Sequence, residues 1–228
     1  MENVSAPKTS AEYAYQNIKQ WIITGELPPD QKIDQDRLAQ KLGVSRMPVR
    51  GALDKLAAQG FVILNSYRGV TVRGLSAKHL DDIYLTRCTL ESLAVKQAIH
   101  NLTPKAILKL KELLNMQYQL SKHPDTNLDK ILPVNRKFHM YIYTLADNPV
   151  MFDIINNLWD QSERYRRILL NTPGMMDGST KEHNHLVQLM IEGQEDEAAE
   201  FLTIHNRKTQ KVVLETMEKN KRNEELEK

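Results

Sequence analysis

The chain has 228 residues, of which 41% are hydrophobic and 26% charged, as in a globular protein with one large domain or two smaller ones. No apolar run approaches the ~20 residues that cross a bilayer, and no secretory signal pattern follows Met1, so we expect a cytoplasmic protein without a membrane span. Cys88 is the only cysteine, which excludes an intrachain disulfide framework. The net charge of +2, taken alone, argues against a nucleic-acid partner.

The charge is unevenly distributed along the chain. Residues 1–75 carry ten basic and seven acidic side chains, and the imbalance is sharpest within residues 37–73. In that window Asp54 is opposed by seven basic residues, Arg37, Lys41, Arg46, Arg50, Lys55, Arg68 and Arg73. A local charge of +6 is expected of a surface that contacts phosphates, although an ordinary solvated face with a chance surplus of basic residues would give the same count.

Three helices are predicted at the start of the chain. Apolar residues at helical spacing predict the first over residues 10–24. Asp34 is a candidate N-cap for a short second helix, which a tight turn at Gly43 ends. Ser45 is predicted to cap a third helix that Gly60 stops.

A hairpin is predicted next, because two β-prone runs, residues 61–64 and 70–72, flank a loop that contains Gly69. This order of elements is that of a winged helix-turn-helix, whose second helix of the pair enters the major groove of DNA. Arg46 and Arg50 lie four residues apart and share a face of that helix, where a guanidinium can pair with guanine or phosphate. The alternative is that both arginines simply solvate an exposed helix.

The segment Leu38 to Leu53, LAQKLGVSRMPVRGAL, followed by Leu56, Gly60 and a wing tip, resembles the DNA-binding domain of GntR-type bacterial transcription regulators. The resemblance implies a set of DNA-binding residues, namely Arg37, Ser45, Arg46, Pro48, Arg50, Arg68 and Gly69. Two positions depart from the family pattern. Gly51 stands where glutamate is usual, and Asp36 stands where arginine is frequent.

Residues 76–228 show helical periodicity almost throughout and predict an antiparallel bundle of six or seven helices. The predicted segments are 78–100, 104–121, 128–146, 149–170, 179–192 and 195–220. We therefore expect a mainly α protein, with a winged helix-turn-helix domain over residues 1–75 and an all-helical domain over residues 76–228. The charged tail, residues 218–228, is predicted to fray or to be disordered.

Several polar side chains fall on the inward faces of these predicted helices. Asn135 and His139 share a stripe of the third segment, while His183 and His205 lie on apolar stripes of the fifth and last. Arg87 lies among apolar residues of the first predicted segment, residues 78–100. Each of them singly is interpreted as a satisfied core residue, because burial of a polar group without a partner is costly. Together they suggest a polar cavity, where imidazoles and an oxygen donor can hold a divalent transition metal.

These polar residues resemble the effector domain called FCD, found in the FadR branch of the GntR family. The residues that carry the resemblance are Arg87 with Glu91, the run from Asn135 to His139, Glu182 with His183, and His205. The resemblance implies a zinc or nickel site whose ligands are Asn135, His139, His183 and His205. It also implies a small carboxylate effector that completes the coordination and pairs with Arg87. Asn135 departs from the commoner aspartate and removes a negative charge from the site.

The remaining candidates are interpreted as structural. His185 is predicted to be exposed, Cys88 to act as a small buried hydrophobe, and His79, His100 and His123 to belong to no constellation. Packing is also the first interpretation of three residues that could line the cavity, Tyr84, Tyr165 and Arg166.

Three functional hypotheses follow from these patterns. The first is a homodimeric bacterial transcription regulator, expected to be a repressor, that reads a palindromic operator in double-stranded DNA and responds to a small carboxylate. The second keeps the DNA-binding head but leaves the bundle empty and purely dimerising. The third is a metal-dependent hydrolase with Glu182 as its general base.

Overall fold

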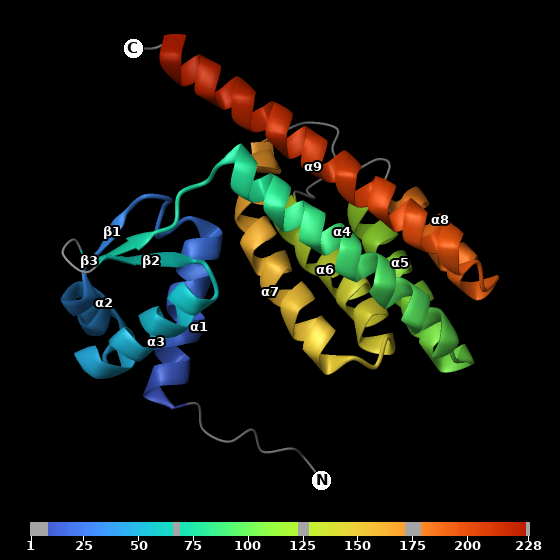
Figure 1. The fold of residues 1–228 in the computed structure, drawn as a ribbon, viewed down its shortest axis with the longest axis horizontal. Helices are drawn as coiled ribbons and strands as arrows, with labels where there is room; N and C mark the ends of the chain where they lie inside the picture. The colour runs from blue at the N-terminus through green and yellow to red at the C-terminus, as the bar shows by residue number, and fades with distance from the viewer. Residues whose placement is uncertain (1–8, 66–68, 123–127, 172–178, 227–228) are drawn as a thin grey trace. The chain divides into compact units, whose positions relative to one another are not determined.

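The computed structural model describes residues 9–65, 69–122, 128–171 and 179–226 (Figure 1). It divides into two compact units, Met1–Ser76 and Ala77–Lys228, each with its own hydrophobic core. Two residues named above, Arg68 and His123, lie outside the described residues. The prediction of a mainly α protein with a small sheet is confirmed.

The first unit contains three helices and a small antiparallel sheet. In chain order its elements are α1 (Ser10–Thr24), β1 (Lys32–Ile33), α2 (Gln35–Leu42), α3 (Arg46–Ala58), β2 (Val62–Asn65) and β3 (Gly69–Val72). The predicted hairpin is confirmed, with Ile63 opposite Thr71. Strand β1 pairs with the other side of β3 and was not predicted, since two residues are too few to show an alternating pattern.

The turn between α2 and α3 forms largely as its residues predict. The Asp34 carboxylate accepts hydrogen bonds from the backbone N–H groups of Asp36 and Arg37, at 3.0 and 3.1 Å. Gly43 ends α2 with φ +65°, a left-handed conformation that costs glycine little. Ser45 occupies the N-cap position of α3, but its side chain makes no capping hydrogen bond, so that part of the prediction is wrong.

The second unit is a helical bundle (Figure 1). Its elements are α4 (Ala77–His100), α5 (Pro104–Lys122), α6 (Leu128–Leu145), α7 (Pro149–Arg166), the 3-10 helix η1 (Arg167–Asn171), α8 (Ser179–Ile191) and α9 (Glu195–Leu226). The long helices α4 and α9 run side by side and pack against each other. Across the described part of the chain, none of the helices combines the length and the apolar character that a membrane span requires.

The C-terminal part of α9 differs from the sequence-based expectation. The helix continues to Leu226, so the predicted fraying from residue 218 is wrong for the described residues. Residues 218 to 223 are exposed, and Arg222 lies 3.6 Å from Glu218 one helical turn earlier. Pairs of opposite charge at this spacing, together with good helix formers, favour a solvated helix without tertiary contacts.

Candidate functional site

Three histidines from three helices converge inside the bundle. We call His139 of α6, His183 of α8 and His205 of α9 the histidine cluster. The Nε2 atom of His183 lies 3.1 Å from that of His139 and 3.3 Å from that of His205. His139 and His183 are each 1% exposed, and one ring nitrogen from each of the three residues lies within 4.8 Å of the others. The structure thus brings together three of the four predicted metal ligands.

The other nitrogen of each ring faces an oxygen atom. His183 Nδ1 lies 2.8 Å from the side-chain carbonyl of Gln117, and His205 Nδ1 lies 2.6 Å from the Glu182 carboxylate. His139 Nδ1 lies 3.4 Å from the Tyr143 hydroxyl. An acceptor on Nδ1 places the ring proton there and leaves the Nε2 lone pair facing the cluster. Three lone pairs that face one another repel unless a cation lies among them, and outer acceptors of this kind are typical of histidine metal ligands.

Burial keeps two of these rings neutral. It lowers the pKa of His139 well below its usual range, and the nearby His183 and His205 rings add to the effect. Burial also lowers the pKa of His183 in the same way. The hydrogen bond to His205 lowers the pKa of Glu182 to about 2, helped by Lys208, so this carboxylate is ionised at neutral pH. A neutral imidazole is the form that coordinates a metal.

The fourth predicted ligand, Asn135, lies beside the cluster and is connected to it through Gln117. Its side-chain oxygen accepts a hydrogen bond from Gln117 Nε2 at 3.1 Å, while the Gln117 carbonyl faces His183. Asn135 lines the same cavity as His139 and His205. An amide oxygen is a hard donor without charge, so the residues that could hold a divalent transition metal offer nitrogen and neutral oxygen.

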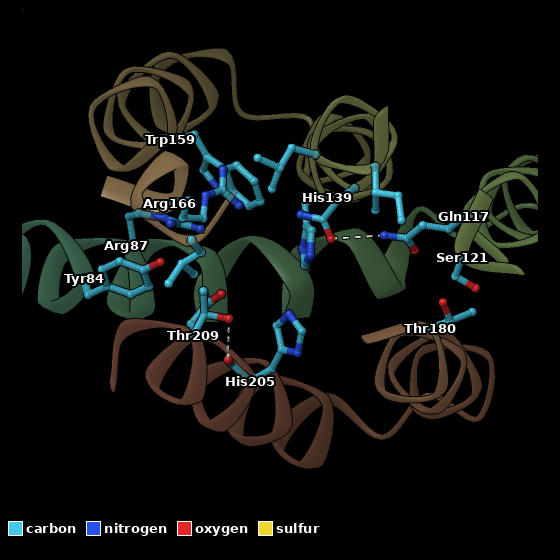
Figure 2. Close-up of a pocket in the computed structure, with 15 residues that line it drawn as sticks. Tyr84, Arg87, Gln117, Ser121, His139, Trp159, Arg166, Thr180, His205 and Thr209 are labelled. Carbon is cyan, nitrogen blue, oxygen red and sulfur yellow. Dashed lines mark hydrogen bonds between the residues drawn. The ribbon is translucent and has the colours of Figure 1, made fainter. Parts of the chain in front are cut away.

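A cavity of about 100 Å³ adjoins the cluster (Figure 2). Its polar lining residues are Tyr84, Arg87, Gln117, Ser121, Asn135, His139, Arg166, Thr180, His205, Asn206 and Thr209. In Figure 2, His139 and His205 lie in the middle, with Tyr84, Arg87 and Arg166 to one side and Gln117, Ser121 and Thr180 to the other. The cavity is small, so a ligand that fits it has a short chain.

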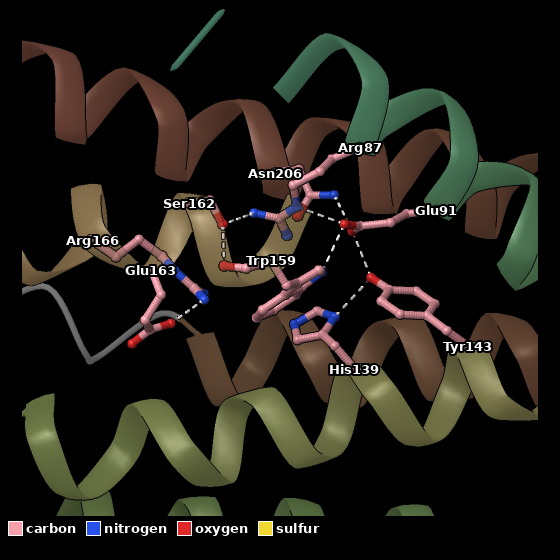
Figure 3. Close-up of polar contacts among 9 residues, drawn as sticks. All are labelled: Arg87, Glu91, His139, Tyr143, Trp159, Ser162, Glu163, Arg166 and Asn206. Carbon is pink, nitrogen blue, oxygen red and sulfur yellow. Dashed lines mark hydrogen bonds and ion pairs between the residues drawn. The ribbon is translucent and has the colours of Figure 1, made fainter. Parts of the chain in front are cut away.

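Arg87 is buried in a hydrogen-bonded network whose centre is Glu91 (Figure 3). Glu91 is fully buried and accepts hydrogen bonds from Arg87 Nε at 2.7 Å, Trp159 Nε1 at 2.8 Å, the Tyr143 hydroxyl at 2.6 Å and Asn206 Nδ2 at 2.8 Å. Burial alone would lower the pKa of Arg87, but Glu91, Tyr84 and Tyr143 together outweigh it and raise that pKa. Among the described residues nothing hydrogen-bonds to Nη2 of Arg87, while Nη1 donates to Ser162 at 2.9 Å.

The Glu91 network also reaches the histidine cluster. The Tyr143 hydroxyl donates its proton to Glu91, so its oxygen can accept the Nδ1 proton of His139. Burial, followed by the nearby Glu91, raises the pKa of Tyr143 well above its usual range and keeps the phenol protonated. One chain of hydrogen bonds therefore connects Arg87, Glu91, Tyr143 and His139.

Sequence reasoning missed Gln117, Tyr143 and the position of Glu182. Gln117 could have been found, because it follows Leu110, Leu113 and Leu114 at helical spacing and is buried with them. Tyr143 lies one turn after His139 on α6, so helical spacing also places it near that ring. Glu182 gives no such signal, because its partner His205 lies on a different helix.

The other described histidines and the cysteine lie outside the histidine cluster. His185 is exposed, as predicted, and its ring meets Phe201 edge-on with centroids 4.8 Å apart. His79 lies 2.9 Å from the Tyr165 hydroxyl, and the exposed His100 lies 3.4 Å from Glu195. Cys88 is buried, and burial raises the pKa of its thiol, in agreement with a small apolar role.

The predicted DNA-binding residues cluster around the start of α3. Ser45, Arg46 and Arg50 are exposed, and Pro48 between them is partly buried. Arg37 on α2 is also exposed. Among the described residues neither Arg37 nor Arg50 forms an ion pair, so both can contact phosphates. The Ser45 hydroxyl is free of a capping bond for the same purpose.

Two more residues belong to this surface: Gly69 in the wing, and Asp36, which stands where arginine is frequent in the family. Gly69 begins β3 opposite Asn65 with φ +80°, a conformation that glycine adopts easily. The Asp36 carboxylate lies 3.5 Å from Arg46 Nη1, and both side chains are about two thirds exposed. A pair this exposed contributes little to stability, but it offsets part of the positive charge of Arg46.

Several basic residues of the 37–73 window have hydrogen-bond or ion-pair partners within the protein. Lys55 lies 3.3 Å from Glu12 and over the Tyr15 ring, and Lys41 pairs with Glu26. Arg73 donates to the Gly60 carbonyl at 2.8 Å. The local charge of +6 therefore overestimates the positive surface, because acidic partners outside the window neutralise part of it.

Comparison with known proteins agrees with this arrangement. Residues 10–72 match the family described as bacterial regulatory proteins, gntR family, and residues 82–208 match the FCD domain. The HTH-type transcriptional regulator McbR of Escherichia coli strain K12 is 33% identical over 143 residues, which is 63% of this chain and 64% of McbR. The Nta operon transcriptional regulator of Aminobacter aminovorans is 28% identical over 187 residues, 82% of this chain and 86% of that protein. A solved structure of E. coli McbR/YncC has the same fold, with a TM-score of 0.79 at 24% identity over 92% of this chain and 100% of that chain.

A winged helix-turn-helix unit joined to an all-helical unit defines a class of two-part transcription regulators. The chain belongs to the GntR family of bacterial regulatory proteins, in the group that carries an FCD domain. Both resemblances are thereby confirmed, and the hydrolase hypothesis is wrong, because the relatives are transcriptional regulators. The structure also argues against Glu182 as a general base, since its carboxylate contacts the His205 nitrogen that faces away from the cluster.

Proposed function

We propose that this chain acts as a cytoplasmic homodimer that binds a palindromic DNA operator and releases it when a small carboxylate enters the helical unit beside a bound divalent metal. The observation that carries the proposal is the convergence of three Nε2 atoms inside the bundle of a chain whose other unit is a winged helix-turn-helix. A bundle that only dimerises has no need of three imidazoles that converge inside it with their lone pairs facing one another.

The DNA-binding step rests on the exposed end of α3. Arg46 and Arg50 lie one turn apart and are both exposed, so they can enter a major groove, where arginine pairs with the O6 and N7 atoms of guanine. Ser45, Pro48 and Arg37 would fix the helix on the phosphate backbone, and Gly69, with Arg68 beside it in sequence, would approach the minor groove. Two copies of this unit in a symmetric dimer require an operator with matching twofold symmetry.

The metal-binding step rests on the histidine cluster and Asn135. Zinc or nickel held by three imidazoles and an amide oxygen would offer an open position to a carboxylate oxygen. Arg87 points its guanidinium into the same cavity and would pair with that acid. The acid can shift the balance between DNA-binding and released states only by its difference in affinity for the two.

The DNA-binding part is tested with an operator selected from random duplex DNA by the purified full chain. Arg50→Ala is expected to weaken operator binding by about 10- to 100-fold, because a bidentate contact with a base contributes ~1–3 kcal/mol. Lys55→Ala is the matched control on the same helix, since Lys55 already pairs with Glu12. Titration by fluorescence anisotropy measures both. Equal binding by Arg46→Ala, Arg50→Ala and the parent protein would contradict the assignment of α3.

The outer acceptors make a separate prediction about the metal. Glu182→Gln is expected to lower zinc affinity by about 10- to 100-fold, because the carboxylate that orients His205 and increases its basicity is lost. Glu192→Gln, which removes an exposed carboxylate just after α8, should leave the affinity unchanged. Competition with a chelating dye measures both constants. An unchanged constant in Glu182→Gln would show that the contact with His205 has no part in metal binding.

A further inference from the structure

Two buried polar atoms that line the cavity have no hydrogen-bond partner among the described residues. They are the Tyr84 hydroxyl and Nε of Arg166. Tyr84 is 1% exposed and Arg166 is 5% exposed, so solvent does not compensate for the missing partners. A buried polar atom without a partner is costly, and two of them in one cavity indicate a ligand that supplies the bonds. Sequence reasoning interpreted both residues as packing residues.

The two residues lie on the same side of the cavity, around Trp159. The Arg166 guanidinium lies 4.4 Å from the centre of the Trp159 ring, and the Arg87 guanidinium lies 4.2 Å from it. Arg87 also lies 4.9 Å from the Tyr84 ring. Figure 2 shows Tyr84, Arg87 and Arg166 together, separated from Gln117 by the histidines in the middle. The cavity therefore has a cationic end that is distinct from the histidine cluster.

The chemistry of this end selects an acceptor with negative charge. Nε of arginine can only donate a hydrogen bond, and the tyrosine hydroxyl can donate as well. A carboxylate accepts from both, whereas an ammonium group has only donors and would be repelled by the guanidinium groups. This excludes an amino acid whose ammonium group occupies this end of the cavity.

The charges of the whole cavity indicate how many carboxylates the ligand carries. Glu91 offsets Arg87, and Glu163, 2.5 Å from Arg166 Nη2, offsets Arg166. The Asn135 amide is neutral, and Lys208 offsets Glu182 beside His205. A divalent metal in the site proposed above would therefore leave two uncompensated positive charges, which a dianion neutralises and a monoanion does not.

We propose that Tyr84 and Arg166 bind the second carboxylate of a short dicarboxylate whose first carboxylate lies at the histidine cluster. This inference rests on the proposed function, because it assigns the chemical class of the effector at that same site. The small volume of the cavity limits the ligand to a short chain. Succinate and butyrate are suitable probes, since both have four carbon atoms and differ in the second carboxylate.

Calorimetric titration of the zinc-loaded full chain in a buffer free of carboxylate and phosphate tests the proposal. The parent protein is expected to bind succinate at least 10-fold more tightly than butyrate. Arg166→Gln should reduce succinate affinity to that of butyrate and leave butyrate within 2-fold. Tyr84→Phe, which retains the ring and its packing, should reduce succinate affinity several-fold, whereas Tyr13→Phe on the exposed side of α1 should not.

Each outcome decides between the proposals. Equal affinity for the two acids in the parent protein, or full succinate affinity in Tyr84→Phe and Arg166→Gln, would overturn the dicarboxylate assignment and leave a monocarboxylate effector intact. Binding of neither acid by protein with a full complement of zinc would overturn both the dicarboxylate and the carboxylate effector. If Arg166→Gln does not fold, the comparison of acids in the parent protein and in Tyr84→Phe still decides the matter.

Discussion

Replacing His183 with alanine is expected to lower zinc affinity by more than ~100-fold. The Nε2 atom of His183 lies within 3.3 Å of those of both other histidines, so it is the central donor of the cluster. Losing a direct ligand should cost more than losing an outer partner, which typically costs about 10- to 100-fold. Equilibrium dialysis followed by elemental analysis of the protein fraction measures the remaining affinity.

The same variant should lose the stabilisation that zinc gives to the parent protein. Free zinc at 100 times its dissociation constant stabilises the folded state by about 2.7 kcal/mol, which for a chain of this size raises the melting temperature by roughly 5–11 °C. His183→Ala should show almost none of this rise. His185→Ala, two residues along on the exposed side of α8, should keep all of it. A full rise in His183→Ala would place the metal elsewhere or show that the bundle holds none.

Glu91→Ala is expected to destabilise the helical unit by about 3–5 kcal/mol, the usual cost when one partner of a buried ion pair is removed. The change leaves the guanidinium of Arg87 buried without its counter-charge, and it also removes the acceptor for Trp159 and Asn206. Chemical denaturation followed by far-ultraviolet circular dichroism measures the loss. The fall in melting temperature should be roughly 6–20 °C.

The control for Glu91 is an exposed carboxylate in the same unit. Glu112 on α5 accepts from Lys109 at 3.1 Å, and both side chains are about half exposed, so Glu112→Ala should change stability by at most ~1 kcal/mol. Similar losses in the two variants would mean that the Glu91 network does not stabilise the bundle. Glu91→Gln retains the volume and separates the loss of charge from the loss of packing.

The DNA-binding unit was predictable because its signals are local. The Asp34 cap, the left-handed turn at Gly43 and the β-prone runs on either side of Gly69 each depend on a few adjacent residues. The acidic partners of its basic residues were not predictable. Lys55 pairs with Glu12, which is 43 residues away, and Lys41 pairs with Glu26. The first pair forms because α1 packs against α3. The second forms because the turn after α1 places Glu26 beside Lys41.

In the helical unit, the sequence by itself determined which side chains point inward. Helical periodicity orients Arg87, His139, His183 and His205 relative to the axes of their own helices, and the structure finds all four buried or partly buried. Periodicity gives no position along a neighbouring helix. For that reason the distances between Nε2 atoms could not be derived from the sequence.

Only the tertiary structure decided the chemistry of the site. The packing of α5, α8 and α9 places Gln117 and Glu182 on the outer nitrogens, and these contacts turn the three lone pairs toward one point. The packing of α4 and α7 leaves the Tyr84 hydroxyl and Nε of Arg166 at the cavity without a hydrogen-bond partner among the described residues. The sequence determined the family and the inward residues, because capping and periodicity act within one helix. The tertiary structure decided their partners, because a hydrogen bond between helices depends on how those helices are placed against each other.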